Sequence, residues 1–339
     1  MNKISILLIT FLSLAILDAE AKLSAKIGIV KDGYNFWLYE PDNTSSSNSS
    51  SSSTKQNNAE DDPQFNPPVE SGNPDDFFPI NLDSLSTEEQ IAYEMWGNEL
   101  WGDSISYRNR NADGDKKPLV IFLHGRSLCG NNLNKVLRYG TVDALKKGRE
   151  IDAYVIAPQN PGTFWKPDNI MNVADWVIDR YPIDTNRIYV LGMSLGGYGT
   201  IDLTAAYPDR IAAAMALCGG GSRKDLSGLN EVPLWIIHGT ADAAVSVNES
   251  RKVKNKMKEA GETPLLRYDE WAGVNHGALA RLFYLEDTYK WLFKHTLDNR
   301  TVDTSISITQ NDTKNAYKGF KHRTSTKGKS KAKKNSKKK

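Results

Sequence analysis

From Pro118 onward, short and continuously apolar runs alternate with longer segments that carry apolar residues at helical spacing. Short apolar runs bounded by turns are typical of strands buried on both faces, and helical spacing is typical of amphipathic helices. The predicted strands are 119–123, 153–157, 188–191, 211–217, 234–237 and 265–268. The predicted helices are 133–147, 170–181, 198–207, 246–260 and 278–294. This alternation predicts an α/β fold with one mostly parallel, doubly wound sheet and helices on both faces.

Residues 118–300 form one predicted domain, and an earlier segment adds a strand to it. Residues 33–41 alternate in polarity and are rich in aromatic side chains, which is typical of an edge strand, so 22–40 are assigned to the first strand of the domain. Residues 41–117 are interpreted as an insertion. To about residue 80 this insertion is rich in Ser, Asn, Asp and Pro, so it has too few apolar side chains to form a core and is expected to be largely disordered.

The N-terminal 21 residues have the pattern of a secretory signal peptide. Lys3 precedes an apolar run from Ile4 to Leu17, and Ala19-Glu20-Ala21 fits an A-x-A cleavage site. An uncleaved membrane anchor is the alternative, but the apolar run is shorter than the roughly 20 residues that a membrane span needs. The sequence therefore predicts an exported protein, either periplasmic or extracellular.

The charge of the chain is unevenly distributed. The formal net charge is +2, but 11 of the 43 Lys and Arg residues lie in 318–339, which contains no Asp or Glu, so the rest of the chain is acidic. Residues 301–339 are polar and then Lys-rich, and are expected to be a disordered tail. The tail acts either as a solubilising end or in electrostatic contact with anionic polymers or lipid surfaces. A nucleic-acid partner is not expected.

The segment Gly192-Met193-Ser194-Leu195-Gly196 follows a predicted strand and precedes a predicted helix. G-x-S-x-G in this context is typical of a nucleophile elbow, in which a strained turn exposes the serine hydroxyl and the glycines allow strand and helix to approach closely. The alternative is an ordinary glycine-rich turn with Ser194 as a helix cap. We favour Ser194 as a nucleophile.

A serine nucleophile needs a base, and the base needs an acid to orient it. His276 follows the last predicted strand, at the edge of the sheet where the strands end. Asp242 follows the strand before it, so the three candidates occur in the chain order Ser194, Asp242, His276. The rival acid is Asp184, which precedes the strand of the elbow and is better suited to a turn. The remaining histidines are weaker candidates for the base, namely His124, His238, His295 and His322.

An oxyanion hole needs two backbone N–H groups. We expect one from Leu195, directly after the nucleophile, and one from Arg126, in the loop after the first parallel strand, with Ser127 as the next choice. The Arg126 side chain is also a candidate for holding an acidic substrate. Trp165 lies in another loop at this edge, either as an aromatic surface for an aryl acid or sugar or as a buried anchor of the loop.

The two cysteines, Cys129 and Cys218, are too few for a disulfide-rich scaffold. Both follow predicted strands at the same edge, so they either form one disulfide or are separate small core residues. Neither has a metal-ligand partner at short spacing, and the histidines form no H-x-x-x-H pair. No metal and no cofactor are expected.

The chain resembles the α/β-hydrolases through YNFWLYEP, PLVIFLHGRSLCG, DTNRIYVLGMSLGGYGT, HGTADAAV and NHG, in 33–41 and 118–300. It is similar to exported bacterial esterases and predicted peptidases related to dienelactone hydrolases, phospholipase/carboxylesterases and the prolyl-oligopeptidase catalytic domain. In such enzymes the first of these motifs usually lies close before the second, whereas here residues 41–117 intervene.

The resemblance implies a secreted serine hydrolase that cleaves carboxylic esters through a Ser-His-Asp triad and an acyl-enzyme intermediate. Its substrate would be a small-molecule or polysaccharide ester, for example an acylated or feruloylated polysaccharide. The alternatives are a serine peptidase of the prolyl-oligopeptidase type and a non-catalytic binding protein that uses the fold as a platform.

Overall fold

The computed structural model describes residues 22–41, 116–318 and 320. The predicted signal peptide, the insertion apart from its first and last residues, and the Lys-rich end from residue 321 lie outside the described residues. Within the described part, no helix has both the length and the apolar character needed to cross a bilayer.

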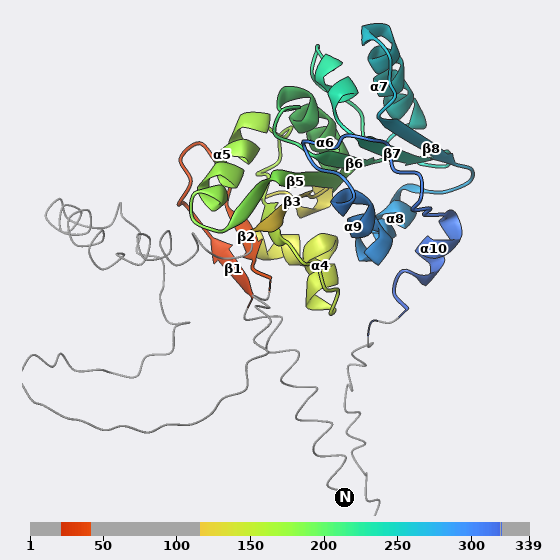
Figure 1. The fold of residues 1–339 in the computed structure, drawn as a ribbon. Helices are drawn as coiled ribbons and strands as arrows, with labels where there is room; N and C mark the ends of the chain where they lie inside the picture. The colour runs from red at the N-terminus through yellow and green to blue at the C-terminus, as the bar shows by residue number, and fades with distance from the viewer. Residues whose placement is uncertain (1–21, 42–115, 319, 321–339) are drawn as a thin grey trace, which may run out of the picture.

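The described chain is built around one eight-stranded sheet, whose strand order is β1-β2-β4-β3-β5-β6-β7-β8 (Figure 1). At one edge β1 pairs with β2 and β2 pairs with β4, both antiparallel, and all remaining pairs are parallel. The strands are β1 (Leu23–Lys26), β2 (Phe36–Tyr39), β3 (Lys117–Leu123), β4 (Tyr154–Pro158), β5 (Ile183–Met193), β6 (Ala213–Leu217), β7 (Leu234–Gly239) and β8 (Leu266–Trp271). The expected mostly parallel, doubly wound sheet is confirmed.

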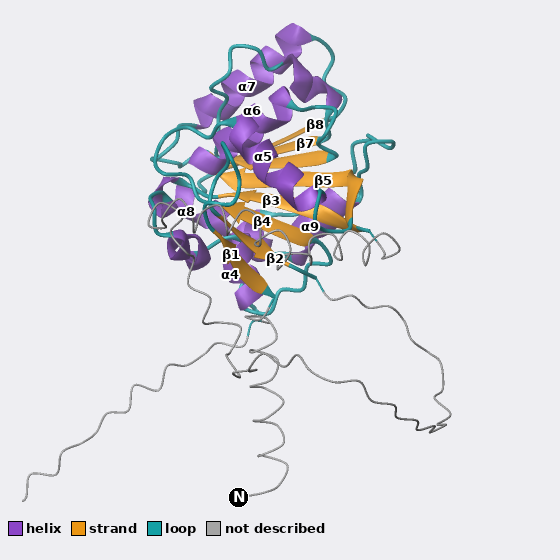
Figure 2. Cartoon of the chain, turned by 90° about the vertical axis from the view of Figure 1, so that its left-hand side faces the viewer, coloured by secondary structure: helices purple, strands orange, loops and turns teal. Residues whose placement is uncertain are grey.

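Helices cover both faces of the sheet, because successive residues of each central strand point to opposite sides. In β3, Leu119 and Ile121 belong to one core cluster, whereas Val120 and Phe122 belong to the other. The first cluster is closed by α5 (Pro167–Ile178), α6 (Leu195–Ala206), η5 (Ser227–Glu231) and α7 (Val247–Ala260). The second is closed by α4 (Thr141–Lys146), α8 (His276–Leu279), η6 (Ala280–Tyr284), α9 (Glu286–Phe293) and α10 (Gln310–Asn315). Figure 2 shows the sheet between these two layers.

The direction in which successive strands are added to the sheet reverses at β3, because β4 lies on one side of β3 and β5 lies on the other. In open α/β sheets, the loops that follow the two strands at such a switch point leave a crevice at the carboxyl ends of the strands. Here these loops carry Arg126 and Ser194, so the topology alone brings two of the predicted site residues to the same crevice.

The turn between β5 and α6 depends on close backbone contacts. A Cβ on Gly196 would lie 1.9 Å from the Leu123 carbonyl oxygen, and a Cβ on Gly192 would lie 2.4 Å from the Gly196 carbonyl oxygen. Ser194 between them has φ 60° and ψ −122°, a conformation that costs a non-glycine residue about 1–3 kcal/mol. Glycine at both positions therefore lets the elbow pack directly on the end of β3.

Two predicted helices are broken in the structure. The segment 133–147 becomes η4 (Leu133–Arg138) and then α4, because Gly140 has φ 89° and a Cβ there would lie 2.1 Å from the Phe122 ring. The segment 278–294 becomes α8, η6 and α9, because the Thr288 hydroxyl and the Tyr289 hydroxyl donate to carbonyl oxygens at the end of η6 and satisfy them outside a continuous helix.

Both ends of the domain also differ from the sequence prediction. Residues 22–40 form the two strands β1 and β2 rather than one. Residues 301–318, which were expected to belong to a disordered tail, include α10, and Ile308 and Ala316 pack into the core beneath η6 and α9. A few apolar side chains in a polar segment are enough to anchor it to a preformed face.

We expect Gly196→Ala to lower the free energy of unfolding by more than about 2 kcal/mol, because the backbone atoms that meet the new methyl group cannot move aside. The higher helix propensity of Ala opposes this by only about 1 kcal/mol. Urea unfolding measures the difference. The matched control is Gly277→Ala, where the nearest atom would be 3.9 Å away and the change should stay below about 1 kcal/mol. Equal effects at the two positions would contradict the packing account.

Candidate functional site

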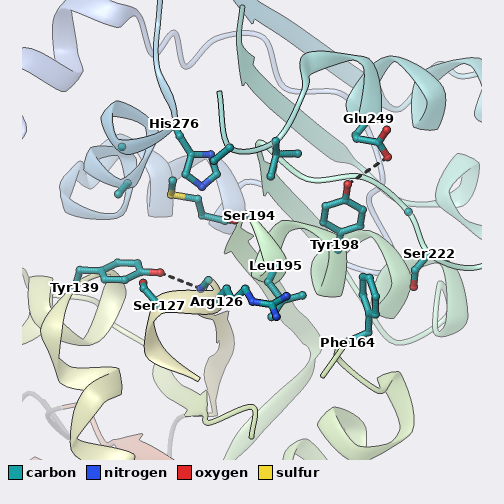
Figure 3. A pocket seen from close by; sticks show the side chains of 17 residues that line it. Arg126, Ser127, Tyr139, Phe164, Ser194, Leu195, Tyr198, Ser222, Glu249 and His276 are labelled. Atoms are coloured by element: carbon teal, nitrogen blue, oxygen red, sulfur yellow. Dashed lines mark hydrogen bonds between the residues drawn. The ribbon is translucent and has the colours of Figure 1, made fainter. Parts of the chain in front are cut away.

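A pocket of about 810 Å³ opens at the carboxyl edge of the parallel strands (Figure 3). It is lined by residues from the loops after β3, β4, β5, β6, β7 and β8. Four of the five predicted site residues line it, namely Arg126, Ser194, Leu195 and His276. The fifth, Asp242, lies behind His276 and is hydrogen-bonded to it.

Ser194 lies at the floor of the pocket, at the N-cap of α6. The helix has 12 residues, and the partial positive charge of its N-terminus faces the same space. Figure 3 shows Ser194 and His276 next to each other on this floor. The elbow therefore places Ser194 and His276 on one pocket.

The Asp242 carboxylate is held by the His276 ring and by two backbone amides. His276 Nδ1 is 2.6 Å from Asp242 Oδ2, and Oδ1 accepts hydrogen bonds from the N–H groups of Ala244 and Val245 at 2.8 and 2.9 Å. Burial acts to raise the pKa of Asp242, but the hydrogen bonds from Val245, His276 and Ala244 outweigh it and hold that pKa below its ordinary value. Because an ionised carboxylate only accepts, Nδ1 is the donor of this hydrogen bond, and in the neutral form of the ring the lone pair then lies on Nε2.

A second histidine supports this acid. His238 is fully buried at the end of β7, its Nε2 lies 2.9 Å from the Val245 carbonyl oxygen, and the same atom is 3.5 Å from Asp242 Oδ2. The Ser250 hydroxyl lies 2.7 Å from its Nδ1. Burial lowers the pKa of His238, so the ring stays neutral and ties the turn that carries Asp242 to the start of α7. From the sequence, His238 is only one of several histidines at strand ends.

Arg126 and Leu195 are each the first residue of a helix, η3 (Arg126–Leu128) and α6. Their N–H groups therefore have no acceptor within the helix. The His124 ring fixes the first of them: Nδ1 lies 2.8 Å from the Gly125 carbonyl oxygen, while Nε2 accepts from the Asn160 N–H at 3.0 Å. In a planar trans peptide, a Gly125 carbonyl turned toward His124 directs the Arg126 N–H the opposite way.

Tyr139 holds the same loop from the other side. Its hydroxyl accepts a hydrogen bond from the Gly125 N–H at 2.9 Å, and its ring lines the pocket (Figure 3). The Gly125 peptide groups are thus fixed at both the N–H and the carbonyl. Tyr139 lies in a segment that the sequence predicts only as helical, without a signal for a role in the site.

Two alternatives from the sequence lie elsewhere. Asp184 is at the start of β5, far along the strand from Ser194, where its carboxylate accepts from the Asn186 N–H and pairs with Arg187. Trp165 is 3% exposed and packs against Tyr34 and His124, as a buried anchor of its loop. Its neighbour Phe164 is 58% exposed and lines the pocket instead.

The two cysteines are free thiols in the structure, so the suggested disulfide is not formed. Among the described residues, Cys218, Asp242 and His276 are the group whose ligand atoms lie close enough, within 4.8 Å, to hold a metal ion. Burial and the nearby Asp242 carboxylate keep the pKa of the Cys218 thiol well above its usual range. A protonated thiol beside an imidazole that is already bonded to the carboxylate is a poor ligand set.

Comparison with known proteins gives partial matches. A model of the prolyl oligopeptidase family matches residues 163–220. A probable acetylxylan esterase A of Neosartorya fischeri is 32% identical over 97 residues, 24% of this chain and 26% of that protein. An acetylxylan esterase A of Emericella nidulans is 32% identical over 103 residues, 24% of this chain and 34% of that protein. The chain therefore spans about a quarter to a third of the length of these relatives.

Among solved structures, a thermostable esterase is 28% identical, with a TM-score of 0.48, and the match covers 55% of this chain and 57% of that one.

We expect the buried His124 ring, which contacts the Gly125 carbonyl oxygen and the Asn160 N–H, to make the free energy of unfolding depend on pH. Burial lowers the pKa of His124 to about 4, against an ordinary value near 6.5. Between these two pH values His124 is therefore protonated in the unfolded chain and neutral in the folded chain. This contribution is complete above pH 6.5 and is lost as the pH falls from 6.5 to 4, by up to about 1.4 kcal/mol per pH unit. Urea unfolding of the wild type and of His124→Gln across this range gives the free energy of unfolding as a function of pH. We expect its slope against pH to be shallower for the variant; identical slopes would contradict a neutral His124.

Proposed function

Because this chain is an α/β-hydrolase, we propose that it is a serine hydrolase that cleaves carboxylic esters through Ser194, His276 and Asp242. The observation that carries the proposal is the hydrogen bond between Asp242 and His276, a histidine that lines the same pocket as Ser194. A binding protein would have no need for a strained serine beside an oriented imidazole.

In the proposed reaction, His276 Nε2 takes the hydroxyl proton of Ser194 as Oγ attacks the ester carbonyl carbon. The oxyanion that forms accepts hydrogen bonds from the N–H groups of Leu195 and Arg126. The imidazolium is stabilised by Asp242 and then protonates the leaving alcohol, which leaves an acyl-enzyme. Water activated by the same imidazole releases the acid and restores Ser194.

The proposed substrates are acyl esters of polysaccharides. The chain is similar in sequence to acetylxylan esterases, which supports an ester as the scissile group and a polysaccharide as its carrier. The match to the prolyl oligopeptidase family supports a peptidase as the second candidate. We favour the ester because an ester leaving group departs more easily than an amine and needs only the triad and the two N–H donors.

We also propose that the protein is exported, on the pattern of residues 1–21. We propose that the Lys-rich end takes no part in catalysis and serves as a solubilising segment or as a contact with anionic surfaces.

We expect Ser194→Ala to abolish both ester hydrolysis and labelling by a fluorophosphonate probe, with an unchanged circular dichroism spectrum. Asp242→Asn should lower kcat by at least about 10³-fold with a smaller change in KM, because the ring loses its orientation and its counter-ion. Asp184→Asn is the matched control, since it removes a carboxylate at the other end of β5. An equal loss of kcat at Asp184 would reject Asp242 as the acid, and labelling that persists without Ser194 would reject the nucleophile.

The choice between ester and peptide is testable with one panel of substrates. We expect kcat/KM for acetylated xylo-oligosaccharides to exceed that for aminoacyl and peptidyl 4-nitroanilides, because amide cleavage requires the departure of a poorer leaving group. Higher kcat/KM on the anilides would replace the esterase proposal with the peptidase one.

A further inference from the structure

We propose that Phe164, Tyr198, Ser222 and Glu249 form a binding subsite for one sugar ring, which carries the ester to be cleaved. We call these four residues the acceptor wall. This inference rests on the proposed ester hydrolysis and deepens it: it assigns one side of the pocket to the sugar and leaves the opposite side to the acyl group.

The pocket has two sides around Ser194. Figure 3 shows Tyr139 and Ser127 on one side of the serine, and Phe164, Ser222 and Glu249 on the other. An ester whose carbonyl carbon lies at Ser194 must extend its acyl group to one side and its alcohol to the other. The chemistry of the two sides therefore decides the orientation of the substrate.

The acceptor wall offers an apolar surface that is already exposed. Phe164 is 58% exposed, although large apolar side chains are usually buried, and its ring lies 6.2 Å from that of Tyr198 at an angle of 69°. The two rings form a corner that faces the pocket (Figure 3). The C–H face of a sugar ring can pack against such an aromatic surface.

The polar groups beside this corner are hydrogen-bond acceptors. The Tyr198 hydroxyl donates its proton to Glu249 Oε2 at 3.2 Å, and the Lys252 ammonium donates to Oε1 at 2.7 Å. Burial and the Glu249 carboxylate raise the pKa of Tyr198 to about 12, so the hydroxyl keeps its proton. Each Glu249 oxygen keeps further acceptor capacity for a ligand.

Ser222 adds another acceptor. Its hydroxyl donates to the buried Asp202 carboxylate, and Asp202 also accepts from the backbone N–H of Ser222 at 2.9 Å. The hydroxyl proton of Ser222 is thus directed away from the pocket, and the lone pairs of Oγ remain for a ligand. Asp202 lies on α6, so the same helix that begins at the nucleophile fixes this acceptor.

A ligand that satisfies this side must present several donors next to an apolar face. A sugar ring does so with its hydroxyl groups and its C–H face, whereas an acetyl group has no donor at all. Arg126 lines the same pocket, and its guanidinium supplies donors for the ring oxygens. The acyl group therefore lies on the side of Tyr139 and Ser127.

The test compares two esters of the same acid that differ only in the alcohol: an acetylated xylo-oligosaccharide and 4-nitrophenyl acetate. For Glu249→Gln, we expect the ratio of kcat/KM for the sugar ester to that for the nitrophenyl ester to fall about tenfold or more, the effect of weakening a hydrogen bond to a charged group. Phe164→Ala should also lower this ratio, because it removes the aromatic face against which the sugar packs. Tyr198→Phe should lower this ratio less, because it keeps the ring.

The matched controls are Glu270→Gln, which removes the charge from a similar Tyr–Glu hydrogen bond with Tyr268 on β8, and Ile29→Ala, which shortens an exposed apolar side chain outside the pocket. Neither should change the ratio. An unchanged ratio in the wall variants, with hydrolysis still dependent on Ser194, would overturn the subsite and leave the esterase proposal intact. A loss confined to aminoacyl anilides with a free amine would also overturn it, because Glu249 would then bind an ammonium group.

Discussion

The contact between Gly196 and the Leu123 carbonyl is the constraint on which the site depends. Because a Cβ at residue 196 would lie 1.9 Å from that oxygen, only glycine allows the elbow to rest on the end of β3. This contact places the N-terminus of α6 against the loop that carries Arg126. The two proposed N–H donors come from segments about 70 residues apart, and this backbone contact brings the two segments to one pocket.

The side chains around this contact make the site rigid before any substrate binds. His124 and Tyr139 fix the two peptide groups of Gly125, while His238 and Ser250 fix the turn that holds Asp242. These histidines are buried and their pKa values are lowered, so they act as neutral hydrogen-bonding groups in the working range of pH. Donors and acceptors that need no rearrangement stabilise a developing charge most effectively.

The sequence predicts the parallel strands well, because a buried strand needs a continuous apolar run. Candidate residues at the carboxyl ends of strands, such as Asp242 and His276, follow from the same pattern, and the structure brings them together. The sequence does not reveal that Phe164 rather than Trp165 faces the pocket, since adjacent aromatic residues in an irregular loop carry no periodicity. Nor does it predict α10, whose position depends on contacts of residues in and around it, such as Ile308 and Ala316, with a part of the core that is distant in sequence.

The most direct test of the account is a crystal structure of the enzyme after reaction with a fluorophosphonate, whose tetrahedral phosphorus imitates the intermediate of ester hydrolysis. The account predicts a covalent bond to Ser194 Oγ, with the phosphonyl oxygen within about 3.1 Å of the N–H groups of both Leu195 and Arg126. An adduct on another residue, or a phosphonyl oxygen directed away from either N–H group, would contradict it.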